Sequence, residues 1–183
     1  MVMDAEIVCR TPTDYAEMAL RPLEAEQCVL VVIDIQQKLL PAIFQKEQLV
    51  RNAQLLIRAA AILKVPAVVS TQNAKGLGGT VPEVASLLMG TEVIDKTLFS
   101  CFGSDVFCSV LKRLPGQRNT LLLCGMESHI CVTQTALGAL RQGYLVQRGI
   151  RRGQFADGVE LEDRAGAHAS CGRGDFVDRD DDL

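Results

Sequence analysis

The stretch CVLVVID at residues 28–34 decides the fold, because it is an apolar and mostly β-branched run that ends in a carboxylate. A strand with one solvated face alternates polar and apolar residues, whereas a strand of a parallel sheet is buried on both faces and is apolar throughout. Residues 28–34 therefore predict a central parallel strand with Asp34 at its carboxyl end.

A helix and a second strand follow along the chain. Apolar residues recur at helical spacing across residues 47–64, and Pro66 disfavours helical geometry in the residue before it. The pattern predicts a helix over residues 47–64, a strand over residues 66–70 and a loop over residues 71–82, which contain three glycines among polar residues.

The second half of the chain continues this alternation. Ser104 can cap a helix, and Gly143 is placed to end one in left-handed geometry. Strands that alternate with helices predict an α/β fold of three layers, in which helices cover both faces of a doubly wound, mostly parallel sheet and ligands bind at the carboxyl ends of the strands. The predicted elements are strands at residues 92–96 and 120–125, a helix from about residue 105, a helix at residues 128–142 and a strand from Tyr144.

Length and charge narrow the class of protein. A chain of 183 residues fits one domain. A formal net charge of -3 with scattered basic residues offers no surface for a phosphate backbone, so we expect no nucleic-acid partner.

No apolar run approaches the roughly 20 residues of a membrane span, and residues 1–27, an N-terminal extension, carry acids where a signal peptide has bases. We therefore expect no membrane partner and a cytoplasmic location, and seven cysteines without a C-x-x-C pair fit reduced thiols.

Residues 125–131, with the sequence GMESHIC, place Cys131 in the first turn of a predicted helix. Free amides and the positive end of the helix dipole lower the pKa of a thiol there, and a neighbouring Lys96 would lower it further. The alternative is that Cys131 is a small core residue, like Cys124. In isolation Asp34 reads as a turn residue and Lys96 as a solvated side chain, but the topology puts all three at one edge of the sheet.

Three motifs in this order resemble those of the isochorismatase-like cysteine hydrolases, a superfamily that includes nicotinamidases. They are VVIDIQ at residues 31–36, DKTLFSCF at residues 95–102 and GMESHIC at residues 125–131, and with Gln72 and residues 76–83 the resemblance covers residues 28–147.

The resemblance implies roles for individual residues. Cys131 would be the nucleophile, Asp34 the general base and acid, and Lys96 the group that balances the charge between them. It also implies a cis peptide bond between Met126 and Glu127, which would aim the backbone amides of Glu127 and Cys131 into an oxyanion hole.

The reaction expected from these residues is hydrolysis of a small amide-type C–N bond through a thioester with the enzyme. Candidate substrate-pocket residues are Gln36, Gln72, Phe99 and His129, although a half-exposed histidine at a helix start is common without any such role. Two alternatives stay open: a weakly active or inactive member that serves as an oligomeric binding or scaffold protein, and hydrolysis of a vinyl ether of the isochorismate type. We also expect a homo-oligomer.

No metal and no cofactor are expected. Nicotinamidases of the superfamily that this chain resembles hold a metal with one Asp and two His. This chain has only His129 and His168, and the corresponding stretch, residues 71–78, contains neither His nor a carboxylate. The chain instead resembles the metal-free branch of isochorismatase domain-containing proteins.

Residues 148–183 differ from the rest of the chain. Charged residues crowd this segment without apolar periodicity, which favours disorder. Resembling proteins continue into another helix and a final strand, so we expect the C-terminal part of the fold to be incomplete, and we hypothesise that a reading-frame shift near codon 147 replaced it. The expected organisation is an extension at residues 1–27, a hydrolase domain at residues 28–147 and an atypical tail.

Overall fold

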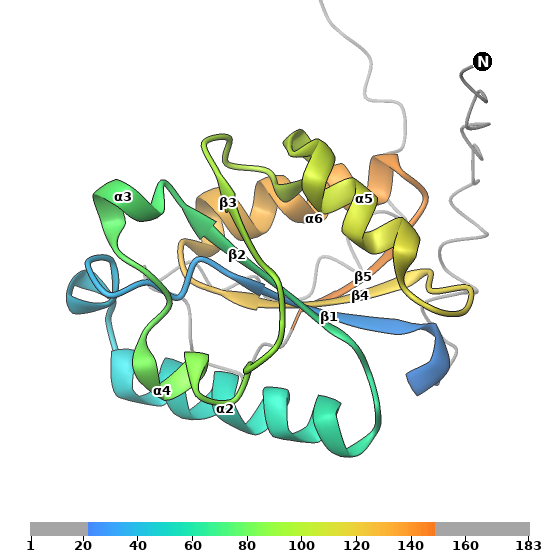
Figure 1. Cartoon of the computed structure of the whole chain (residues 1–183), viewed down its shortest axis with the longest axis horizontal. Helices are drawn as coiled ribbons and strands as arrows, with labels where there is room; N and C mark the ends of the chain where they lie inside the picture. Colours follow the sequence, from blue (N-terminus) through green and yellow to red (C-terminus); the bar gives the residue numbers. More distant parts are fainter. Residues whose placement is uncertain (1–21, 149–183) are drawn as a thin grey trace, which may run out of the picture. The chain divides into compact units, whose positions relative to one another are not determined.

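The computed structural model describes residues 22–148, so the predictions for residues 1–21 and for all but the first residue of the tail at residues 148–183 lie outside the described residues. Strands and helices alternate along the described chain (Figure 1). Short helical turns lie at Ala25–Gln27, Leu40–Ala42, Cys101–Gly103 and Ser128–Val132. The main elements are β1 (Cys28–Ile33), α2 (Lys46–Ile62), β2 (Ala67–Gln72), α3 (Ala74–Leu77), α4 (Pro82–Ala85), β3 (Val93–Lys96), α5 (Asp105–Arg113), β4 (Thr120–Gly125), α6 (Thr133–Arg141) and β5 (Leu145–Arg148).

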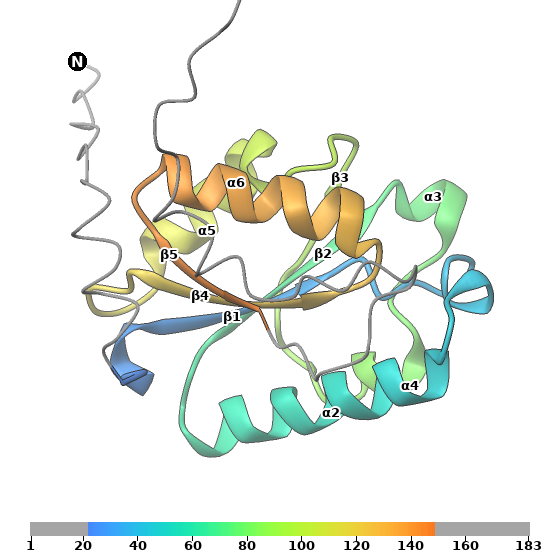
Figure 2. The same cartoon turned by 180° about the vertical axis from the view of Figure 1, so that it is seen from behind.

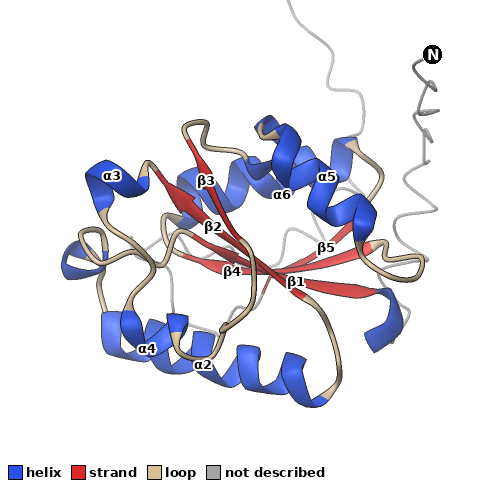
Figure 3. Ribbon diagram, in the orientation of Figure 1, coloured by secondary structure: helices blue, strands red, loops and turns tan. Residues whose placement is uncertain are grey.

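The strands form one parallel sheet in the order β3-β2-β1-β4-β5 (Figure 3). From β1 the chain moves outward to β2 and β3, and it then returns to the other side of β1 with β4. The predicted doubly wound sheet is therefore confirmed. In such a sheet the carboxyl ends of the two strands at the reversal, here β1 and β4, form the crevice where ligands bind.

Helices cover both faces of the sheet, which confirms the three predicted layers. The views from front and back place α2 and α4 on one face and α5 and α6 on the other (Figures 1 and 2). Successive side chains of β1 point to opposite faces of the sheet. Val31 packs in the core beneath α5 and α6, and Val32 packs in the core against α2. This double burial explains why β1 is apolar at every position.

Local contacts shift several boundaries away from those that the sequence pattern predicts. β2 runs on to Gln72 because Thr71 and Gln72 pair with Asp95 and Lys96 of β3. The loop predicted at residues 71–82 contains α3, and α4 begins at its last residue; Asp95 Oδ1 accepts the Ala74 amide of α3 at 2.8 Å. Because these stabilising partners are remote in sequence, local periodicity does not reveal them. No helix among residues 22–148 is long and apolar enough to cross a membrane.

Candidate active site

Asp34 follows β1 directly and is fully buried. Its φ of 53° lies in the left-handed region, which aspartate enters more readily than most other residues. Its amide still donates to the Ser70 carbonyl oxygen at 3.1 Å, so the backbone leaves the sheet only after this residue. Left-handed backbone that the surroundings hold in place is common at functional sites.

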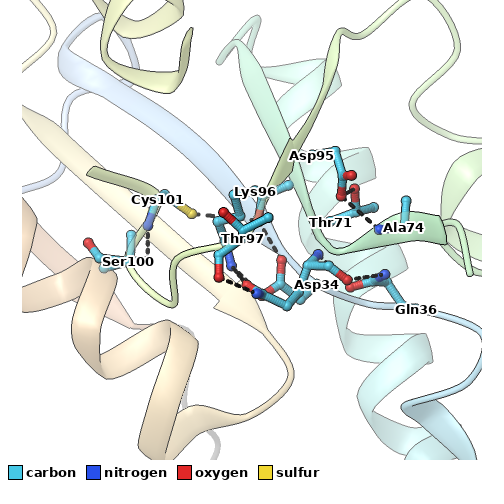
Figure 4. A network of polar contacts seen from close by, with 12 residues as sticks. Asp34, Gln36, Thr71, Ala74, Asp95, Lys96, Thr97, Ser100 and Cys101 are labelled. Carbon is cyan, nitrogen blue, oxygen red and sulfur yellow. Dashed lines mark hydrogen bonds and ion pairs between the residues drawn. The ribbon is translucent and has the colours of Figure 1, made fainter. Parts of the chain in front are cut away.

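Lys96 is the last residue of β3, and its side chain crosses the end of β2 to reach Asp34 (Figure 4). Lys96 Nζ donates at 2.8 Å both to Asp34 Oδ2 and to Oε1 of Gln72, its partner on β2. The two charged side chains are 1% and 0% exposed. The interpretation of Lys96 as a solvated side chain is therefore wrong, because a buried ammonium needs a partner of opposite charge.

Cys131 lies in the π-helical turn Ser128–Val132 that leads into α6, and it is only 4% exposed. Burial raises the pKa of Cys131 to about 12; a hydrogen bond with Asp34 and the charge of Asp34 also raise it, while Lys96 lowers it. The expected lowering of this pKa is therefore wrong, because the loss of thiolate hydration on burial outweighs the nearby positive charge. The resting Cys131 is therefore a protonated thiol at neutral pH.

The turn between β4 and this helix differs from its expected geometry. No peptide bond among residues 22–148 is cis, so the cis bond expected between Met126 and Glu127 is wrong. The chain instead reverses through Glu127, whose φ is 55°. Gly125 precedes the turn at a close approach of the two strands, since a Cβ there would overlap the Ile33 carbonyl oxygen.

The four candidate pocket residues fall into two groups. Gln36 is fully buried; its Nε2 donates to the carbonyls of Gln72 at 3.1 Å and Gly78 at 2.6 Å, and its Oε1 accepts the Gln72 amide at 2.7 Å. Gln72 Oε1 accepts from Lys96, and its Nε2 donates to the Thr97 carbonyl at 2.9 Å. Both amide hydrogens of Gln36 are thus used within the protein, and the two glutamines brace the loops around the ion pair.

The other two candidates are open to solvent. Phe99 is 57% exposed and lies in the loop that follows Lys96. The side chain of His129 is 61% exposed, and its Nε2 lies 3.4 Å from Glu127 Oε2. Both residues can therefore reach a molecule outside the protein.

The structure adds a second line of contacts to Asp34 that sequence reasoning missed. Ser70 Oγ donates to Asp34 Oδ1 at 2.8 Å, and Cys101 Sγ lies 3.5 Å from Ser70 Oγ. The Cys101 amide in turn donates to Thr135 Oγ1 of α6 at 3.0 Å. One signal for Ser70 was available, because it comes near the end of a buried strand as Asp34 does.

Within residues 22–148, no group of three or more His, Cys, Asp or Glu side chains is placed to hold a metal ion. The prediction that the protein works without a metal stays a prediction.

A profile of the Isochorismatase domain family matches residues 28–147. This chain belongs to the isochorismatase family. Among curated relatives, a secreted isochorismatase effector, Isc1, of Phytophthora sojae is 38% identical over 119 residues, which are 63% of this chain and 56% of the relative. The chain thus spans little more than half the length of that relative.

Solved structures share the fold. The MAR1 ribonuclease of Caenorhabditis elegans superposes with a TM-score of 0.64 at 32% identity, over 70% of this chain and 65% of the other. The YcaC gene product of Escherichia coli, described as an octameric hydrolase of unknown specificity, has a TM-score of 0.62 at 21% identity and the same coverage, a likeness that shows the fold alone.

Proposed function

We propose that this isochorismatase family member is a cysteine hydrolase that cleaves a small amide-type C–N bond through a thioester. The observation that carries the proposal is the buried ion pair between Lys96 and Asp34, 2.8 Å apart, whose two charges both act on the pKa of the Cys131 thiol. A buried ion pair is weak evidence for stability alone, because desolvation offsets much of the attraction. Such a pair beside a nucleophilic atom is better explained by proton transfer.

The high pKa of Cys131 gives Asp34 a definite task. A protonated thiol attacks a carbonyl carbon slowly, so a base must take its proton as the C–S bond forms. Asp34 accepts that proton and passes it to the leaving amine when the C–N bond breaks. Water, deprotonated by Asp34, then attacks the thioester, and the acid product leaves while the proton returns to Cys131.

Lys96 and the turn after β4 stabilise the charges that develop during these steps. The Lys96 ammonium balances the buried charge of Asp34, and it favours the thiolate of Cys131 as the proton moves. We assign the oxyanion hole to the backbone amides of Glu127 and Cys131, with Phe99 and His129 as substrate contacts.

A catalytic test uses the full chain and a panel of small amides, with an isochorismate-type vinyl ether and a short RNA as alternatives. We expect amide turnover and a thioester adduct on Cys131, detected by mass spectrometry and cleaved by hydroxylamine. The variant Cys131→Ala should lose both signals, whereas Cys108→Ala, which alters a half-buried thiol outside the site, should keep them.

Other outcomes would distinguish the competing functions. Turnover of the vinyl ether without an adduct would replace the thioester mechanism, and cleavage of RNA would extend the activity of the nematode relative to this chain. We disfavour RNA because the net charge of -3 provides no basic surface. If no substrate is turned over and no adduct forms, the scaffold interpretation replaces the enzyme.

We further propose a homo-oligomer in the cytoplasm. Leu55 and Ile62 on α2 and Met89 after α4 are large apolar side chains exposed to solvent, and apolar groups of this kind are found in association surfaces. The Escherichia coli relative is described as an octamer. A monomeric mass measured by light scattering would overturn the proposed oligomer. The cytoplasmic location stays a prediction, and one relative is named a secreted effector.

A further inference from the structure

We propose that Ser70 is a positioning residue that turns the Asp34 carboxylate toward Cys131, and that Cys101 fixes the direction in which the Ser70 hydroxyl donates. This inference rests on the proposed function, because it concerns how Asp34 works as a base. It adds to the site two side chains that the three-residue arrangement does not include.

The two oxygens of Asp34 accept hydrogen bonds from different partners. Oδ2 accepts from Lys96 Nζ at 2.8 Å, and Oδ1 accepts from Ser70 Oγ at 2.8 Å. Asp34 is fully buried and Ser70 is almost fully buried, so bulk water cannot substitute for either donor. Two donors on separate oxygens fix the rotation of the carboxylate, which a single ion pair does not.

The hydroxyl of Ser70 has only one hydrogen, so its direction matters. An ionised Asp34 accepts hydrogen bonds and cannot donate, so Ser70 must give its hydrogen to Oδ1. The Ser70 oxygen can then accept from Cys101, whose Sγ lies 3.5 Å away. Burial raises the pKa of Cys101, which keeps it a thiol that can donate. The chain of hydrogen bonds, written from donor to acceptor, therefore runs from Cys101 through Ser70 to Asp34.

The same contacts link Asp34 to the helix that follows Cys131. The Cys101 amide donates to Thr135 Oγ1 on α6, and α6 continues directly from the turn that contains Cys131. The base and the nucleophile are thus held by one set of buried contacts, so that the carboxylate keeps its orientation relative to the thiol.

Loss of the Ser70 hydroxyl should change the acidity of Cys131 in a definite direction. Without the Ser70 donor, Oδ1 keeps its full negative charge in a buried place, and Asp34 holds the Cys131 proton more tightly. The variant Ser70→Ala should therefore shift the pH at which Cys131 becomes reactive upward. Its reaction with iodoacetamide at neutral pH should slow by about tenfold, as expected for a lost hydrogen bond to a charged group.

The experiment measures the rate of iodoacetamide labelling of Cys131 against pH, followed by peptide mass spectrometry in the full 183-residue chain. The conservative variant Ser70→Thr retains the hydroxyl and should restore the wild-type profile. Cys101→Ala should shift the midpoint in the same direction by less, because it removes the donor to Ser70 and leaves the Ser70 hydroxyl in place.

A packing control separates positioning from general loosening. Val68 lies two residues before Ser70 on β2, in the core cluster that also contains Cys101 and Cys131. The variant Val68→Ala removes apolar contacts without touching a hydrogen bond, so it should change stability and leave the midpoint of the profile in place.

The outcomes separate failure of this inference from failure of the proposed function. Asp34→Asn should alter the Cys131 profile strongly, and if it does not, the proposed role of Asp34 itself fails. If Asp34→Asn alters the profile but Ser70→Ala matches wild type, only the positioning role is overturned. An equal midpoint shift in Val68→Ala would likewise overturn it in favour of packing.

Discussion

Lys96 Nζ lies 2.8 Å from Asp34 Oδ2 although the strands that carry them are not neighbours in the sheet. β2 runs between β1 and β3, and the long lysine side chain passes over its end, where Gln72 Oε1 accepts a second hydrogen bond. A shorter cationic side chain could not span that strand. The two charges therefore meet across the end of β2, a strand that carries neither of them.

Replacing Lys96 with Met should destabilise the protein strongly. Removal of the ammonium leaves Asp34 buried without its opposite charge, which typically costs about 3 to 5 kcal/mol of unfolding free energy. Urea denaturation followed by circular dichroism measures the change. The double variant Lys96→Met/Asp34→Asn should recover part of the loss, because no unpaired charge then remains.

The exposed pair between Arg113 and Glu92 provides the matched control for this prediction. Its atoms lie 3.4 Å apart, with side chains 68% and 57% exposed. Arg113→Met should change the unfolding free energy by less than about 1 kcal/mol, because water screens such a pair. Similar losses for Lys96→Met and Arg113→Met would contradict the importance of burial.

Stability should fall in alkaline solution partly because of Cys131. The unfolded thiol ionises near its ordinary pKa of 9.0, whereas the folded one keeps its proton to about pH 12. The folded state binds more protons between these values, so this contribution is fully present below pH 9 and is lost as the pH rises, by up to about 1.4 kcal/mol per pH unit.

Urea denaturation at pH 8, 9 and 10 tests this dependence. Cys131→Ala should flatten the fall with pH, and so should Cys124→Ala, because burial raises the pKa of Cys124 to about 12 as well. The neighbouring core variant Val132→Ala should lower stability at every pH and leave the slope as it is in the wild type. If Cys131→Ala keeps the wild-type slope, burial does not raise the pKa of the folded Cys131 thiol above that of the unfolded one.

The order of the elements could be predicted from the sequence because burial on both faces leaves a strong local pattern. The apolar run at Cys28–Ile33 and the strand at Thr120–Gly125 have the predicted starting residues. The end of β2 and the helix α3 escaped prediction, since pairing with β3 and the carboxylate of Asp95 stabilise them from a distance.

The meeting of Asp34, Lys96 and Cys131 could also be predicted, because the carboxyl ends of parallel strands share one edge. The raised pKa of the Cys131 thiol could not be predicted, since it depends on how deeply Cys131 is buried and on the nearby carboxylate of Asp34. Ser70 was missed for a related reason: a serine at a strand end has many explanations until its partner is known.

Gln36 should hold the loop after β2 in place, which hydrogen exchange can detect. Replacement with Leu removes its bonds to Gln72 and Gly78 and leaves the Gln72 amide without its partner. We expect a loss of roughly 2 to 4 kcal/mol in unfolding free energy and faster amide exchange across residues 72–79. Gln54→Leu, which removes one exposed bond to the Glu83 carbonyl, should change neither quantity appreciably.

Gly125 should tolerate no side chain, because a Cβ there would overlap backbone and side-chain atoms of Ile33 on the neighbouring strand. Backbone cannot move aside as a rotamer can, so Gly125→Ala must push β4 away from β1 where Asp34 and the turn to Cys131 begin. We expect a loss of at least about 1 to 3 kcal/mol in unfolding free energy, together with slower labelling of Cys131. Gly79→Ala is the control, since a Cβ at Gly79 would meet no atom within 4 Å. Equal stability of the two variants would show that the strands can separate at Gly125 without strain.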